Sequence, residues 1–205
     1  MVERVAVIFN RFSHKPLDVV GGSTAPGAGI QQYGYHGGDA QRWRIKDVGQ
    51  GPVASGAHTM QTRFSISARG NAITVNTPDT VWQQPLAPST PFAAAAGQLW
   101  ALEELPLGSA LDTRRYVIRN TRDDTVLGLR TDDRDDHVPL SLGAYQNKES
   151  QRWEIVYELD LNRLDLNDIM AIFNKNSAKC LDVPGATGND IDIQQYIYNG
   201  GRNQF

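Results

Sequence analysis

The sequence has little cysteine, little excess charge of either sign and no long apolar run. One cysteine, Cys180, cannot form an intrachain disulfide, and together with four histidines it cannot build a cysteine-rich zinc site. Lys and Arg total 20 and Asp and Glu total 23, which leaves no basic surface for nucleic acid or anionic membrane. No apolar stretch approaches the roughly 20 residues of a membrane helix. We therefore expect no nucleic-acid partner, no membrane insertion, no metal and no cofactor.

The N-terminal segment gives an expectation about the compartment. Met1–Ala6 has an early acidic residue and no long apolar region, so it does not match a secretory signal. A single cysteine suits a reducing compartment. We expect the protein to be cytoplasmic or secreted by a non-classical route.

Internal repeats organise the chain. The triplet Gln-x-Trp begins at Gln41, Gln98 and Gln151, and Gln204 lies at the next interval. Segments before the triplet recur as well: Ile8-Phe9-Asn10 as Ile172-Phe173-Asn174, Leu17-Asp18-Val19 as Leu181-Asp182-Val183, and Ile30-Gln31-Gln32-Tyr33 as Ile193-Gln194-Gln195-Tyr196. We call the repeats unit one (about 1–48), unit two (58–105), unit three (110–158) and unit four (within 159–205, after a linker).

Short segments within the units predict β-strands. They are rich in Val, Ile, Phe or Tyr and are bounded by Gly, Asp, Asn and Ser, and they cover Arg4–Asn10, Arg63–Ala68, Tyr116–Asn120 and Met170–Asn174. The prolines and alanines of 85–96 are interpreted as a loop, because Pro91 and Gly97 leave little room for a helix. Short strands at regular spacing indicate an all-β barrel or sandwich.

The ensemble of Leu-Asp-Val, Ile-Gln-Gln-Tyr and Gln-x-Trp motifs resembles the ricin B-type (R-type) lectin family. The resemblance implies a β-trefoil, in which three units close a six-stranded barrel with a cap of three hairpins. Residues 1–158 would then form one β-trefoil lectin domain. Residues 159–205 would supply a linker and an incomplete fourth repeat, the start of a second trefoil. Since one unit cannot bury its own apolar face, either the chain continues into a second trefoil or homo-oligomerisation supplies the missing units.

The tryptophans and glutamines of the triplet have a structural interpretation. One large apolar ring per unit around a threefold axis would form a shared core, so Trp43, Trp100 and Trp153 are not expected to contact ligand. Each glutamine is expected to hydrogen-bond loop backbone that would otherwise be buried unpaired.

Sugar binding needs a different set of side chains. A carboxylate can accept from two vicinal hydroxyls, an aromatic ring can cover the C–H face, and amides can serve the remaining hydroxyls. The family has Asp in the Leu-Asp-Val segment, Gln and an aromatic in the middle strand, and Asn before the Gln-x-Trp glutamine. By that resemblance the carbohydrate-binding candidates are Asp18, Gln31, Tyr33, His36, Gln41, Asp182, Gln194, Tyr196, Asn199, Asn203 and Gln204.

The four units differ in how complete this set is. Unit four has every type, whereas unit one has Ala40 in place of the Asn, with His36 or Asp39 as substitutes. Unit two has Thr74 at the Asp position, and Trp82 could stack on a sugar, although a patched-over loop is favoured. No sugar clamp is expected in unit three, which has small residues at all four positions: Gly128, Ser141, Gly143 and Ser150.

Other features of the sequence have plainer interpretations. The aspartate of Leu-Asp-Val could cap a turn, but two copies with Gln-x-Tyr downstream favour binding. The acidic run Asp132–His137 lacks the spacing of a calcium loop and is interpreted as solvated. Cys180 is expected to be a buried structural thiol.

The sequence therefore predicts a multivalent lectin for galactose or N-acetylgalactosamine-type glycans, with no catalytic activity. Glycans or glycoproteins would be its partners, and it could be the cell-targeting part of a larger toxin or glycosidase. The alternative is a β-trefoil protein-binding scaffold such as a protease inhibitor, with loops including 85–91 as the contact surface.

Overall fold

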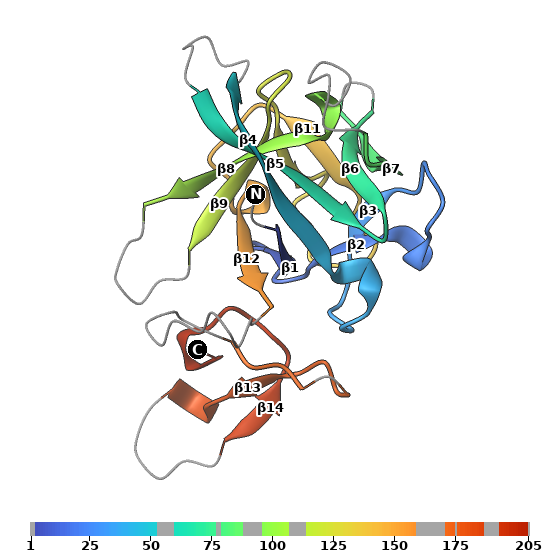
Figure 1. The fold of residues 1–205 in the computed structure, drawn as a ribbon. Helices are drawn as coiled ribbons and strands as arrows, with labels where there is room; N and C mark the ends of the chain where they lie inside the picture. Colours follow the sequence, from blue (N-terminus) through green and yellow to red (C-terminus); the bar gives the residue numbers. More distant parts are fainter. Residues whose placement is uncertain are drawn as a thin grey trace.

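The computed structural model describes residues 3–52, 60–76, 79–87, 96–106, 114–158, 171–174, 176–186 and 193–204. The described residues form β-strands and short 3₁₀ turns (Figure 1). No helix among them is long and apolar enough to span a membrane.

Six antiparallel strands close a barrel. They are β1 (Glu3–Asn10), β4 (Trp43–Pro52), β5 (Met60–Ala68), β8 (Leu99–Leu105), β9 (Arg115–Asn120) and β12 (Trp153–Tyr157). Each pairs with the next, and β12 returns to β1 with Ile8 opposite Ile155. Closure leaves these strands without a free edge. The predictions near residues 4–10, 63–68 and 116–120 are confirmed.

Three hairpins accompany the barrel: β2 (Leu17–Val19) with β3 (Ile30–Gln32), β6 (Asn71–Val75) with β7 (Val81–Pro85), and β10 (Val126–Leu129) with β11 (Leu140–Gly143). Isolated bridges join them in a ring, namely Gly29 to Trp82, Thr80 to Ser141 and Gln31 to Pro139. A six-stranded barrel with three such hairpins is a β-trefoil, which confirms the predicted fold class.

The tryptophans of Gln-x-Trp form the centre of the core. All three are fully buried, and each indole N–H donates to a backbone carbonyl of its own unit's hairpin. The bonds run from Trp43 to Leu17 (3.1 Å), from Trp100 to Ile73 (3.2 Å) and from Trp153 to Leu127 (2.9 Å). This shared geometry makes Asp18, Thr74 and Gly128 structurally equivalent, since each follows the acceptor residue.

The glutamines of the triplet hold the preceding loop. Gln41 Nε2 donates to Gly34 O (2.9 Å), while Gln41 Oε1 accepts from His36 N (2.9 Å). The same pair of bonds is made by Gln98, Gln151 and Gln204, each at the end of a 3₁₀ turn: Asp39–Gln41, Ala96–Gln98, Glu149–Gln151 and Arg202–Gln204. The structural interpretation of both triplet residues is confirmed.

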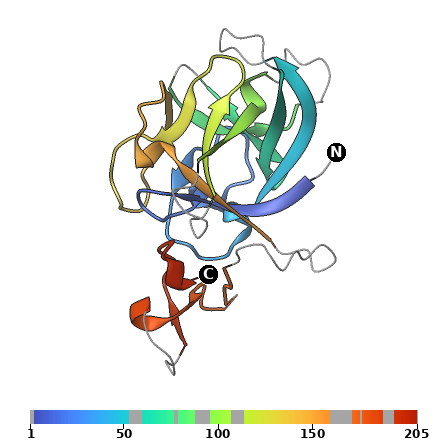
Figure 2. The same ribbon diagram turned by 90° about the vertical axis from the view of Figure 1, so that its left-hand side faces the viewer.

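Unit four lies beyond β12 at one end of the barrel, as Figures 1 and 2 show. It contains a small sheet of β13 (Cys180–Asp182) and β14 (Gln194–Tyr196). The predicted strand Met170–Asn174 is wrong for its described part, where Phe173 makes one isolated bridge, to Cys180; Met170 is outside the described residues. The equivalent β1 is a strand because β4 and β12 flank it, and among the described residues unit four has no such neighbours.

Equivalent aromatic residues join unit four to unit one. Phe9 stacks on Phe173 with ring centroids 6.1 Å apart and planes at 7°, and it lies 4.5 Å from Tyr198. Tyr35 meets Phe173 edge to face at 4.9 Å. Because Phe9 corresponds to Phe173 in the repeat, and Tyr35 to Tyr198, the interface has an approximate twofold character.

Candidate functional site

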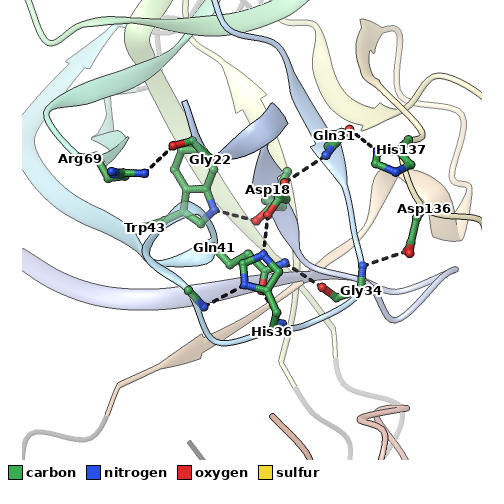
Figure 3. A network of polar contacts seen from close by, with 12 residues as sticks. Asp18, Gly22, Gln31, Gly34, His36, Gln41, Trp43, Arg69, Asp136 and His137 are labelled. Carbon is green, nitrogen blue, oxygen red and sulfur yellow. Dashed lines mark hydrogen bonds and ion pairs between the residues drawn. The ribbon is translucent and has the colours of Figure 1, made fainter. Parts of the chain in front are cut away.

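The first candidate site is built on the β2–β3 hairpin of unit one (Figure 3). Asp18 and Gln31 face each other in register, and Gln31 Nε2 donates to Asp18 Oδ1 at 3.1 Å. Asp18 is 3% exposed. Tyr33 follows directly after β3, and its ring centroid lies 6.1 Å from that of His36. The predicted carboxylate and amide are therefore hydrogen-bonded to each other, and the predicted aromatic ring lies beside the His36 imidazole.

His36 takes the place of the missing asparagine. Its Nε2 lies 3.2 Å from Asp18 Oδ2, and its side chain is 44% exposed. The other suggested substitute, Asp39, pairs instead with Arg42 at 3.2 Å and is exposed. The site's third polar group is therefore an imidazole that can exchange a hydrogen bond with a ligand at the surface.

A histidine from another unit completes this site. His137 of unit three places Nδ1 3.2 Å from Gln31 Oε1, and its ring packs edge to face on Tyr33 at 4.9 Å. In Figure 3, His137 lies on the side of Gln31 that faces away from Asp18. The sequence reasoning missed His137, because it is distant in the chain and stands at the end of the acidic run.

The acidic run is held against unit one. Gln32 Nε2 donates to the carbonyls of Asp133 (3.0 Å) and Asp135 (2.6 Å), and Asp136 accepts from Gly34 N at 2.9 Å. The described residues contain no group of three or more His, Cys, Asp or Glu placed to hold a metal. The run is a solvent-exposed loop, as predicted, but it also positions His137.

Unit four presents the second candidate site. Asp182 is 3% exposed, and its carboxylate accepts from Gln194 (2.8 Å), Asn203 (2.8 Å) and Gln204 (3.0 Å). Tyr196 is 51% exposed beside it on β14. Three of the predicted residues of unit four, Gln194, Asn203 and Gln204, therefore donate to one carboxylate.

Three predicted site residues hold the backbone. Gln41 is fully buried, and its side-chain amide hydrogen-bonds the backbone of the loop at Gly34 and His36. Gln204 does the same in unit four while also orienting Asp182. Asn199 accepts from Gly201 N at 2.8 Å within its turn. Gln41 and Gln204 are therefore buried residues that hold the loops of their sites in place, whereas Asn199 stabilises its own turn.

Units two and three depart from this pattern in different ways. Thr74 faces Trp82 in register, and Gln98 Nε2 donates to Thr74 Oγ1 at 3.0 Å. Trp82 belongs to strand β7, so the interpretation of a patched-over loop at this residue is wrong: the strand continues across the position. In unit three Gly128 faces Ser141, and a hollow of about 220 Å³ opens beside them.

Cys180 has no role at the surface. It is fully buried, and its Sγ lies 3.7 Å from Gln204 O. Burial raises the pKa of the thiol, so the reactive thiolate is disfavoured. The prediction of a structural thiol is confirmed.

Comparisons with known proteins agree with this geometry. The model of the family described as ricin-type beta-trefoil lectin domain-like matches residues 3–68 and 96–196. A designed threefold-symmetric protein, ThreeFoil, is 26% identical with a TM-score of 0.59, over 76% of this chain and 99% of that one. The C-half of an earthworm R-type lectin, solved with GalNAc, is 18% identical with a TM-score of 0.50, over 76% of this chain and 99% of its own.

A third structure extends the likeness to almost the full chain. The hemolytic lectin CEL-III is 15% identical with a TM-score of 0.58, and the match covers 98% of this chain and 51% of CEL-III. No curated protein matches the sequence.

Proposed function

Because the chain belongs to the ricin-type β-trefoil lectin domain-like family, we propose that it binds carbohydrate through units one and four. The observation that carries the proposal is a repeated arrangement. Asp18 and Asp182 are each held by an in-register glutamine, with a tyrosine two residues later. Held carboxylates of this kind serve as fixed acceptors.

The arrangement suits one edge and one face of a sugar ring. A carboxylate fixed by amides accepts from vicinal hydroxyls with charge-assisted hydrogen bonds. The half-exposed ring of Tyr196 covers the apolar C–H face and removes it from water. Asn203 and the exposed imidazole of His36 supply further polar contacts in their respective sites.

Galactose or N-acetylgalactosamine is the ligand class we propose. The earthworm lectin of the same fold was solved with GalNAc, which supports trying this class first. Binding without catalysis is proposed as well, since the family is one of lectin-like domains. A role as the cell-targeting part of a larger protein, in the cytoplasm or after non-classical export, stays a prediction. The alternative of a protease inhibitor that contacts its target through loops including 85–91 also stays a prediction. Residues 88–95 lie outside the described residues, and the loop predicted for 85–96 is wrong at Pro85, which ends strand β7.

The test is binding to immobilised galactosides and GalNAc glycans by the wild-type chain and by Asp18→Asn, Asp182→Asn and the double variant. Each single variant removes one site and its avidity, and a fall of about 10²-fold or more on a multivalent surface is expected. The double variant should not bind. Asp39→Asn is the matched control, because that carboxylate lies near His36 but pairs with Arg42.

Two results would count against the proposal. If the wild-type chain binds no glycan on a broad array, carbohydrate binding is wrong. If the double variant retains full affinity, the binding lies elsewhere on the molecule. Binding only to glycans without galactose or GalNAc would contradict the proposed ligand class but not the proposed location of the binding sites.

We also propose that further units cover the outer face of unit four. Residues buried in unit one have exposed equivalents there: Ile172 is 63%, Leu181 42% and Ile193 60% exposed, while Ile8 and Leu17 are fully buried. A longer chain or other copies could supply the cover. The mass of the native protein tests the longer chain, and light scattering tests association between copies. A native monomer of 205 residues with a folded unit four would exclude both.

A further inference from the structure

Unit four contacts the loop that carries His36 to the site of unit one. The loop covers residues 34–38, and Tyr35 directly precedes His36 in it. The Tyr35 ring lies edge to face with Phe173 of unit four at 4.9 Å, whereas it lies 5.6 Å from Phe9 of its own unit. One loop therefore meets the other unit at one residue and the sugar site at the next.

The same contact occurs in reverse on the side of unit four. The Tyr198 ring lies 4.5 Å from Phe9 and 5.3 Å from Phe173, so it too is closer to the ring of the other unit. Tyr198 corresponds to Tyr35 in the repeat. Reciprocal contacts between equivalent residues are typical of a twofold interface. The contact therefore follows from the way in which the two units meet, since it is made twice.

The loop of unit one is linked to the carboxylate of its site through His36. Gln41 holds the loop backbone on both sides of Tyr35. His36 Nδ1 lies 3.1 Å from Gly38 N, and because a backbone N–H can only donate, Nδ1 accepts and the neutral ring carries its proton on Nε2. The ring therefore donates to Asp18 Oδ2 at 3.2 Å. The position of the backbone at Tyr35 thus decides how the imidazole meets the carboxylate.

Unit three has the same loop with a different partner for its tyrosine. Gln151 holds the loop backbone as Gln41 does, but the hydroxyl of Tyr145 donates to Asn147 of its own unit at 3.1 Å. Unit three also has small residues at the four positions of the sugar set. The tyrosine therefore packs on another unit's phenylalanine in the two units that carry the sugar set.

We propose that Phe173 of unit four is a positioning residue for the sugar site of unit one, acting through Tyr35 on His36. The inference rests on the proposed glycan binding. The contact with Phe173 fixes the Tyr35 ring, and the peptide bond to His36 passes this restriction to the imidazole. A site that is already ordered loses less conformational freedom when ligand binds. The affinity of unit one for sugar therefore depends on unit four being packed against it.

The test is calorimetric titration of the full chain with a galactoside on the Asp182→Asn background, so that unit one alone binds. The variants are Phe173→Ala, Tyr35→Leu and the two combined. We expect about fivefold weaker binding in each single variant and no further loss in the combination, because both changes remove one contact. Ile172→Ala, at a neighbouring position 63% exposed, is the control and should leave the affinity unchanged.

Amide hydrogen exchange gives a second readout, which needs no ligand. His36 N and Gln146 N each donate to the triplet glutamine of their own unit, at 2.9 and 2.7 Å. Phe173→Ala should accelerate exchange at His36 and leave Gln146 in unit three unchanged. Phe173→Leu keeps most of the apolar volume without the ring, and it replaces the alanine variant if that variant does not fold.

Three results would overturn the proposal. They are unchanged galactoside affinity in Phe173→Ala, a combined variant whose loss is the product of the two single losses, and equal acceleration of exchange at His36 and Gln146. If the wild-type chain binds no galactoside, the proposed function is wrong, whereas exchange at His36 still measures whether Phe173 holds the loop. The two proposals therefore fail separately.

Discussion

At the scale of single residues, a carboxylate's role is set by the side chains that donate to it. Asp18, Asp182 and Asp132 are each fixed by neighbouring donors, but they come from two strands and a loop. Sequence repeats revealed the first two, because they recur in one motif. Asp132 was hidden among other aspartates, and only the folded loop brings it to Ser150.

His137 provides a prediction at this scale. His137→Ala removes the ring that contacts Gln31 and packs on Tyr33. The Gln31 side-chain amide then loses a hydrogen bond that contributes about 1 kcal/mol to holding it in place. We expect roughly fivefold weaker galactoside binding, measured by calorimetry on the Asp182→Asn background. Asp135→Asn, an exposed change in the same loop, should have no effect. Unchanged affinity in His137→Ala would show that the contact is incidental.

At the scale of elements, each hairpin is tied to the barrel by one indole hydrogen bond. These bonds recur at Trp43, Trp100 and Trp153, where the donor and acceptor are both buried. A buried carbonyl without its donor carries a desolvation cost. The hairpins therefore depend on the triplet for stability, and the sites on them depend on it for position.

Trp153→Phe tests this dependence. The ring volume is largely kept, but the carbonyl of Leu127 loses its donor at 2.9 Å. We expect a loss of about 1–3 kcal/mol in the free energy of unfolding, measured in urea as a lower midpoint with an unchanged slope. Trp82→Phe, at a half-buried position on β7, should cost less. Equal losses in both variants would argue against a special role for the indole bond.

At the scale of the whole molecule, unit four is held by an aromatic interface. Phe9 of unit one stacks on its counterpart Phe173 and contacts Tyr198, while Tyr35 meets Phe173 edge to face. The buried Cys180 belongs to the same cluster. Burial raises the pKa of the Tyr198 hydroxyl, which keeps that ring uncharged in the interface. The site of unit four therefore has a fixed place relative to that of unit one, as bivalent binding requires.

Phe173→Ala should loosen unit four without unfolding the barrel. The half-buried ring contributes less than a fully buried one, about 2 kcal/mol. Hydrogen exchange should accelerate in β13 and β14 while β1 and β12 stay protected. Ile172→Ala, at a position 63% exposed, is the control. Uniform acceleration in all strands would show instead that unit four and the barrel unfold together.

Cys180 offers a second measurement of the same interface. In the wild-type chain a buried thiol with a raised pKa should react slowly with a thiol reagent at neutral pH. Phe173→Ala should accelerate the reaction several-fold, since the thiol becomes exposed whenever unit four opens. A fast reaction in the wild-type chain would contradict the packing described for this residue.

The sequence by itself determined an all-β repeat protein, the buried Gln-x-Trp triplets and the two recurring sets of aspartate, glutamine and tyrosine, and its resemblance to R-type lectins implied the β-trefoil. The repeats could be recognised because they depend on residue spacing within a unit. Only the tertiary structure decided which residues from different units meet. It placed His137 against Gln31, Phe173 against Phe9 and Asp132 against Ser150. It also decided that residues 171–174 do not form a strand, because a strand requires neighbouring strands that its own sequence does not specify.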